Sequence, residues 1–419
     1  MKNKVILVAM AAALAGGAAF GSGFSLYEPS VPSHALGGAL LGRAIDASAN
    51  NNNPATLTDL TNIVVTVGFV TEHPRGAVRV NNHEFEMDPG FFPLPHFQLA
   101  VPLPADFAFG LSAGVDYGLG TEYSYAWPMN WSTIDTTVQG YVLNPNLAYK
   151  ITEDWSLGVG LRWLFFDFEQ NSMPMAAYEA TPGRVMNMGH FSSRLKGDNR
   201  FRDLGWQIGT SYRITDDFAV GVVYKSAIDV TVNGSSATSC PSADNPVVQK
   251  SMAAITGDSD AGLTLPQSIS GGFNWDFADD WHFGGALSWT QWSVFDRLIF
   301  NLNGYRKPVV LNWHDTWRAS FGLAWDVAED WTAMLGYVYD MDCTDATQAS
   351  TMLPPADRHI ASCGVTWRCW KGLELSLSYS CIFMHGLDMH MENALGQRYD
   401  LETCRGFCHA AGFSVTYRF

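Results

Sequence analysis

Three basic side chains occupy similar positions in runs of alternating apolar and polar residues. Arg162 and Lys225 each lie eight residues beyond an acid of a short turn, Asp154 or Asp217, and Arg318 lies ten residues before another such turn. If these runs are strands of one sheet, a rise of about 3.3 Å per residue brings the three cations to a similar height. Cations gathered at one level can bind a carboxylate.

A second interpretation of these cations is purely structural. Buried charges require partners, and acids stand on the same side of other alternating runs. Candidate partners are Asp203, Asp276, Asp326 and Glu374. The sequence leaves open whether the cations bind a carboxylate or only pair with these acids.

Catalytic and metal-binding patterns are weak. His190 and Ser192 are close together, as in outer-membrane phospholipases, but the Asn-Gly that follows the serine in those enzymes is missing. We therefore expect no enzyme, and a phospholipase is the least favoured alternative. The histidines and cysteines near the C-terminal end match no zinc spacing, so we expect no metal and no cofactor.

The chain begins with the pattern of a secretory signal. Lys2 and Lys4 precede a short apolar run, and Ala19 and Gly21 stand at a typical cleavage site. We expect residues 1–21 to be removed, which changes the net charge from −16 to −18 because two lysines leave. An acidic chain argues against nucleic acid as a partner. The seven cysteines are an odd number, and their pairing cannot be deduced from the sequence.

A short turn recurs through the chain. A small residue and two acids precede an aromatic residue at Thr152–Trp155, Thr215–Phe218, Ala278–Trp281 and Ala328–Trp331, and Pro104–Phe107 is a looser copy. Polar residues at the tip followed by an aromatic residue are typical of hairpin turns. These turns predict that the chain returns repeatedly into one large antiparallel sheet.

The runs between the turns alternate over about 10 to 16 residues, which is long for soluble strands. Trp155, Leu157 and Val159 alternate with small residues, and the run beginning at Trp317 has the same form. Aromatic residues recur at both ends of the apolar faces, as in lipid-facing strands. Since no later segment has 18 consecutive apolar residues, we expect a transmembrane β-barrel in the bacterial outer membrane.

Counting the runs gives fourteen antiparallel strands over residues 61–419, with short turns on one side and long connections on the other. Two of the long connections, 170–199 and 234–264, carry unusually apolar residues. These residues either form a groove that captures a hydrophobic molecule or simply pack the loops together. They are Met173, Met175, Tyr178, Met186, Met188, Val247, Val248, Met252, Ile255 and Leu263.

Residues 22–60 do not alternate and are rich in Gly, Ala, Ser and Asn. We expect this segment to be an N-terminal hatch, or plug, inside the barrel. The alternatives for the whole chain are a plugged transporter and a general diffusion porin, which would have an open polar lumen and no hatch.

With these motifs in view, the chain resembles the outer-membrane long-chain fatty acid and hydrocarbon transporter family, FadL/TodX-like, also called OMPP1. The residues that carry the resemblance follow the family's order. They are Ser22-Gly23-Phe24, Gly42-Arg43-Ala44, Asn53-Pro54-Ala55, Leu265-Pro266, the run Trp289 to Phe295, Trp317-Arg318, Asp330-Trp331 and the run Pro354 to Arg358.

The resemblance implies passive transport of fatty acids or similar hydrocarbons. Cargo is caught among the outer loops, enters a lumenal pocket, and leaves sideways through a kink in the third strand after the hatch N-terminus shifts. Gating would then involve Ser22, Gly23, Phe24, Asn53, Pro54, Ala55, Gly110 and Gly114. The expected partners are the hydrophobic cargo and the outer-membrane lipid and lipopolysaccharide, and we expect a monomer.

Overall fold

The computed structural model describes residues 23–419 except 28, 182–183, 200–202, 241–244, 346–350, 352–355, 387 and 394. Fourteen antiparallel strands close into one barrel, and the seam is the pairing of β1 with β23. The strands are β1 (Val64–Val80), β3 (Phe92–Pro102), β4 (Phe107–Glu122), β5 (Asp135–Lys150), β6 (Trp155–Ser172), β10 (Asp203–Thr215), β11 (Phe218–Lys225), β14 (Ser268–Ala278), β15 (Trp281–Thr290), β18 (Thr316–Ala328), β19 (Trp331–Asp340), β20 (Ala356–Trp370), β21 (Leu373–Gly386) and β23 (Arg398–Arg418).

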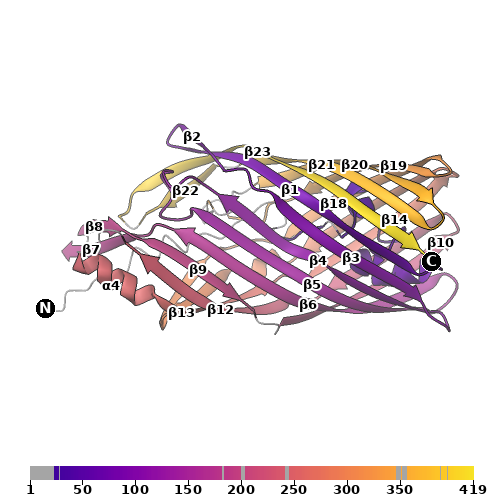
Figure 1. The fold of residues 1–419 in the computed structure, drawn as a ribbon, viewed down its shortest axis with the longest axis horizontal. Helices are drawn as coiled ribbons and strands as arrows, with labels where there is room; N and C mark the ends of the chain where they lie inside the picture. Colours follow the sequence, from indigo (N-terminus) through magenta and orange to yellow (C-terminus); the bar gives the residue numbers. More distant parts are fainter. Residues whose placement is uncertain are drawn as a thin grey trace.

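The strands run obliquely along the long axis of the molecule (Figure 1). Short turns join them at one end, here named the turn end, where the C-terminus also lies. The predicted turns are confirmed: Trp155, Phe218 and Trp281 are the first residues of β6, β11 and β15. Two acids at the tip keep each of these turns in water, while the aromatic residue begins the apolar face.

The outward face of the barrel is apolar. Leu161 and Leu335 on this face are 51% and 58% exposed. Near the turn end, Trp281 stacks on Trp325 with ring centroids 5.1 Å apart. Large apolar side chains exposed over a whole sheet are stable in lipid rather than in water. Among the described residues, no helix is both long and apolar enough to cross a membrane.

The opposite end, here named the loop end, is built largely of further strands. Its elements are β2 (His83–Glu86), β7 (Met175–Thr181), β8 (Arg184–His190), β9 (Ser192–Asp198), β12 (Ile228–Ser239), β13 (Gly257–Leu265), β16 (Arg297–Leu302), β17 (Tyr305–Val310), β22 (Asp388–Glu392), the α-helix α4 (Pro246–Ile255) and the 3₁₀ turn η2 (Trp292–Val294). Connections predicted as long loops, 170–199 above all, therefore contain strands. Of these strands, β12 does alternate, because Val230 and Val232 are buried while Asp229 and Thr231 are exposed.

The N-terminal segment, residues 23–60, folds against the inner wall of the barrel. It contains α2 (Val31–Ala35), α3 (Ala49–Asn52) and the 3₁₀ helix η1 (Pro54–Asp59). Ser30 caps α2 by accepting a hydrogen bond from the Ser33 N–H, and Asn53 caps η1 in the same way. The α2 helix contacts β19, β20 and β21, whereas η1 contacts β5, β6 and β10. The segment thus touches the wall on two sides.

Inward-facing glycines allow the segment to approach the wall closely. A Cβ atom on Gly158 of β6 would overlap the backbone of Pro54 and Ala55, and one on Gly284 of β15 would overlap the backbone of Ala39. Gly221, Gly322 and Gly336 are in the same situation on β11, β18 and β19. Glycine in a strand is typical of such close backbone approach. These positions fix the path of the segment along the wall.

Candidate functional site

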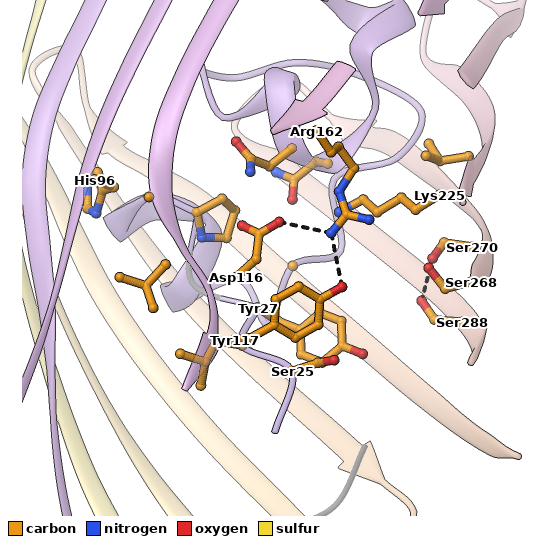
Figure 2. Close-up of a pocket in the computed structure, with 18 of the residues that line it drawn as sticks. Ser25, Tyr27, His96, Asp116, Tyr117, Arg162, Lys225, Ser268, Ser270 and Ser288 are labelled. Carbon is orange, nitrogen blue, oxygen red and sulfur yellow. Dashed lines mark hydrogen bonds and ion pairs between the residues drawn. The ribbon is translucent and has the colours of Figure 1, made fainter. Parts of the chain in front are cut away.

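A polar pocket of about 100 Å³ lies between the N-terminal segment and seven wall strands. Arg162, Lys225 and Arg318 all line it, so the structure brings the three sequence-predicted cations together. Figure 2 shows Arg162 and Lys225 directed into the same space, with Ser268, Ser270 and Ser288 forming a hydroxyl-lined wall beside them.

Arg162 is buried and is held by neighbouring residues of β4. Its NH2 atom lies 3.2 Å from Asp116 Oδ2 and 3.2 Å from the Tyr117 hydroxyl oxygen. These contacts satisfy part of the hydrogen-bonding capacity of the guanidinium, although its Nε has no partner among the described residues. Asp116 is therefore the acid that neutralises Arg162.

Lys225 is the last residue of β11 and lines the same pocket. Its ammonium interacts electrostatically with the charges of Asp116 and Arg162. Within the described part of the chain, its ammonium makes no hydrogen bond or ion pair. A cation without a partner in an enclosed pocket is a ready site for an anionic ligand.

Arg318 links the pocket to the N-terminal segment. Its NH2 donates a hydrogen bond of 3.1 Å to the carbonyl oxygen of Gly37, and its guanidinium lies 4.3 Å from the centroid of the Tyr27 ring. This arrangement is a cation–π contact. Arg318 therefore holds the segment as well as lining the pocket.

The four acids proposed as structural partners lie elsewhere. Asp276 is paired with Arg43 and His282, Asp326 with His282 and Arg368, and Glu374 with Arg418, while Asp203 accepts a hydrogen bond from Asn199. None of them pairs with the three cations among the described interactions.

A second, more apolar pocket of about 70 Å³ adjoins the first and shares Ser25, Leu26, Leu94 and Val115 with it. It lies where β3 and β4 separate. The two strands pair from Pro102 and Ala108 as far as Phe97 and Ala113. Beyond that point β3 pairs only with β1, and Pro93 and Pro95 have no N–H to donate. The barrel wall is therefore unpaired on one side of the apolar pocket.

The N-terminal segment covers part of this gap. The Leu26 N–H donates to the Asp116 carbonyl at 2.8 Å, and the Gly118 N–H donates to the Phe24 carbonyl at 2.9 Å. The register of β4 against β5 shifts between Val115 and Tyr117, so Asp116 occupies a bulge. Residues 24–26 thus take the place on the edge of β4 that β3 leaves vacant.

Phe24 is enclosed by aromatic rings. Its centroid lies 5.9 Å from Tyr117, 5.2 Å from Trp292 and 5.6 Å from Phe295, all in edge-on geometry. Trp313 completes the cage at 6.3 Å. Next to it, Arg358 donates to the Gly23 carbonyl at 3.1 Å. The aromatic cage anchors the N-terminal residues toward the loop end.

The other predicted gating residues have different positions. Asn53 Nδ2 donates to the Leu41 carbonyl at 2.7 Å and to the Thr210 carbonyl at 3.0 Å. Together with Pro54 and Ala55 it therefore anchors the segment to the wall. Gly110 faces Asn50 and Leu57 of the segment, whereas Gly114 stands where β3 and β4 part. Ser22 lies outside the described residues, as does the predicted signal peptide.

The apolar loop residues fall into two packed groups. Met175 packs with Trp127, Met129 and other residues near the loop end. Val248 and Ile255 on α4 pack, with Met252 and Leu263, into the cluster that contains the aromatic cage. Met186 is exposed, Met173, Met188 and Val247 are not fully buried, and the side chain of Tyr178 is outside the described part. None of the described side chains in this set lines the two pockets above.

Several residues of the site were not predicted from the sequence. Asp116 has the parity of Ser112, which faces the lumen, but the sequence alone does not link it to Arg162. Tyr117 was missed because the bulge exchanges which β4 residues face the lumen: Ser112 is buried before it and Leu119 after it. The break in alternation between these two residues is the signal that reveals the bulge.

Gly110 to Gly114 also has the G-x-S-x-G spacing of a hydrolase. It lies within strand β4 and not in the strand-to-helix turn that such a nucleophile needs.

The sequence profile of the family described as outer membrane protein transport protein (OMPP1/FadL/TodX) matches residues 12–419. A long-chain fatty acid transport protein of Salmonella typhi is 24% identical over 408 residues, covering 90% of this chain and 91% of that protein. Outer membrane protein P1 of Haemophilus influenzae is 23% identical and covers 92% and 91%.

Solved structures with the same fold include a FadL homologue of Pseudomonas aeruginosa. It has a TM-score of 0.84 at 21% identity and covers 96% of this chain and 100% of that one. The toluene transporter TbuX of Ralstonia pickettii has a TM-score of 0.67 at 17% identity and covers 94% and 99%. At these identities the likeness concerns the fold.

Proposed function

This chain belongs to the outer membrane protein transport protein family (OMPP1/FadL/TodX), and on that premise we propose that it transports hydrophobic carboxylic acids passively across the outer membrane. The protein is a multi-strand β-barrel of the bacterial outer membrane. Its relatives include transporters of long-chain fatty acids and of toluene. The cargo of this chain is a long-chain fatty acid or a similar amphipathic molecule.

The observation that carries this proposal is the continuity of the two pockets. The polar pocket offers Lys225 to the carboxylate, and the adjoining apolar pocket leads the hydrocarbon tail to the gap between β3 and β4. Release through this gap would pass cargo directly into lipid. Because the pockets are small beside the 300 Å³ or more typical of ligand sites, cargo must displace the N-terminal residues to bind fully.

In this proposal residues 22–60 act as a hatch that leaves the lumen closed to general diffusion. Asn50 donates a hydrogen bond to β3 and accepts one from Asn146 of β5, Asn53 donates one to β10, and the inward glycines keep the segment against the wall. A general porin would need an unobstructed polar lumen. The apolar loop residues would supply the first hydrophobic contact, with outer-membrane lipid and lipopolysaccharide around a monomeric barrel.

Uptake measurements test this function. Cells carrying the protein as their only transporter of this family are given a labelled long-chain fatty acid or an alkane of equal length. Neutralising Arg162 and Arg318 together is expected to reduce fatty acid uptake more than alkane uptake. Equal loss of both cargoes would remove the carboxylate site. Single-channel conductance in planar bilayers distinguishes a plugged transporter from a porin.

A further inference from the structure

The polar pocket already contains a carboxylate of the protein itself. Asp116 Oδ2 lies 3.2 Å from Arg162 NH2, within the reach of a charge-assisted contact. Asp116 is thus paired with Arg162, one of the two cations that a carboxylate cargo would use. The other cation, Lys225, has no partner among the described residues. The side chain of Asp116 is 17% exposed, so water can reach it.

The same residue also holds the N-terminal segment. Its carbonyl accepts the Leu26 N–H, and it forms the bulge from which Tyr117 and Gly118 pair with residues 24–26. One residue is therefore attached through its side chain to the pocket cation and through its backbone to the residues that cover the gap.

We propose that Asp116 is a tethered competitor for the cargo carboxylate, and that its displacement from Arg162 is what releases residues 24–26 from the edge of β4. This inference rests on the proposed function, because it takes the cargo to be a carboxylic acid. Cargo bound to Lys225 and Arg162 replaces one carboxylate by another, so the charge balance of the pocket is kept. The freed Asp116 side chain turns to water, and the bulge loses its support.

This replacement of one carboxylate by another makes the opening step specific for cargo with a carboxylate head group. A neutral molecule can fill the apolar pocket but leaves the ion pair between Arg162 and Asp116 intact. Arg318 continues to hold the Gly37 carbonyl, so only the first residues of the segment need to leave. Asp116 therefore couples the charge of the head group to the covering of the gap.

Amide hydrogen exchange of the full-length protein in lipid nanodiscs tests the coupling. The rate of amide exchange is measured in peptides that contain Leu26 and Gly118, without cargo, with hexadecanoic acid and with hexadecanol. We expect the acid to accelerate exchange at these amides about tenfold, in the usual range of coupling between sites, and the alcohol to leave it unchanged. Equal effects of acid and alcohol, or no effect of a bound acid, would overturn the inference.

Variants of Asp116 separate a competing role from a structural one. In Asp116→Asn the amides of Leu26 and Gly118 are expected to exchange rapidly without cargo and to gain no further acceleration from the acid. This variant should also bind the acid more tightly, because the competing carboxylate is gone. Asp116→Glu retains a carboxylate and should restore the dependence on acid. Weaker binding of the acid by Asp116→Asn would contradict competition. Asp154→Asn, which alters an arginine–aspartate contact in a turn, is the matched control.

Calorimetric titration with hexadecanoic acid separates the two proposals. If the acid does not bind the wild-type protein, the proposed function fails. If it binds, is weakened by Lys225→Met, and yet leaves the Leu26 and Gly118 amides unchanged, only the coupling through Asp116 fails.

Discussion

The ring of Phe24 meets the ring of Trp292 edge-on, with 5.2 Å between centroids. This contact joins the first described residues to the 3₁₀ turn η2 near the loop end. The carbonyl of Phe24 accepts the Gly118 N–H of β4, so the residue whose ring is held in the cage also pairs with the edge strand that borders the gap.

Removing the ring should therefore uncover the gap. Phe24→Ala leaves a cavity in the aromatic cage, and truncation of a buried Phe typically costs about 3–5 kcal/mol. We expect the amides of residues 24–26 to exchange at least tenfold faster, with the barrel strands unchanged, as measured by hydrogen exchange. Phe91→Ala is the control, since Phe91 is 67% exposed. Unchanged protection in Phe24→Ala would show that the cage does not anchor the segment.

Substitution of an inward glycine should displace the segment from the wall. A side chain on Gly158 meets the backbone of Pro54 and Ala55, which cannot yield as a flexible side chain would. We expect Gly158→Val to raise single-channel conductance in planar bilayers. Gly271→Val is its control, because a Cβ there meets nothing within 4 Å. Equal conductance of the two variants would count against docking through Gly158.

Acidification should loosen the α2 part of the segment. His34 is buried and accepts or donates hydrogen bonds of 2.8 Å to the Ser378 and Ser380 hydroxyls. Burial, and then the charge of His96, lower the pKa of His34 to about 4. A histidine kept neutral by docking gains protons when it is released, so docking is strongest above about pH 6.5.

Between about pH 6.5 and pH 4, docking should weaken by up to about tenfold per pH unit. Hydrogen exchange of residues 31–41, corrected for the intrinsic pH dependence of exchange, measures this. His34→Gln retains hydrogen-bonding capacity but cannot titrate, and its segment should respond much less to pH in this range. The same response in both proteins would assign the effect to another group.

Loss of the unpaired cation should discriminate between cargoes. Lys225→Met preserves length and removes the charge, and a hydrogen bond to a charged group contributes about 1.5–3 kcal/mol. We expect affinity for a long-chain fatty acid to fall about 10- to 100-fold while affinity for an alkane is unchanged. Calorimetric titration checks both, with the exposed turn residue Lys371→Met as control. A parallel loss for the alkane would indicate a packing defect.

Much of the barrel could be predicted from local pattern. Lipid on the outer face and a polar lumen impose strict alternation, and acids at several of the short turns mark where the chain reverses, as at Asp154 and Asp280. The three cations could be placed together because strand parity and rise are regular. Tyr117 could not, since a single-residue bulge at Asp116 shifts the parity of everything beyond it.

The position of the N-terminal segment depends on contacts distant in sequence. Asn50 bonds to Asn146 and Gln207, more than ninety residues away. Nothing near Asn50 indicates these partners. The glycines that face the segment, such as Gly158 and Gly284, can be interpreted only once the structure is known. Small residues on the lumen side of several strands then mark where another backbone passes.

The pairing of β1 with β23 also makes the closed barrel depend on the two outermost strands of its sheet. Val64 is opposite Arg418, and Phe69 is opposite Phe413, so the fourteenth strand closes the ring that the first strand begins. Loss of Phe413 and the residues beyond it would leave unpaired backbone groups on both edges of the sheet. The enclosure of residues 31–60 therefore depends on contacts between strands that are far apart in the sequence.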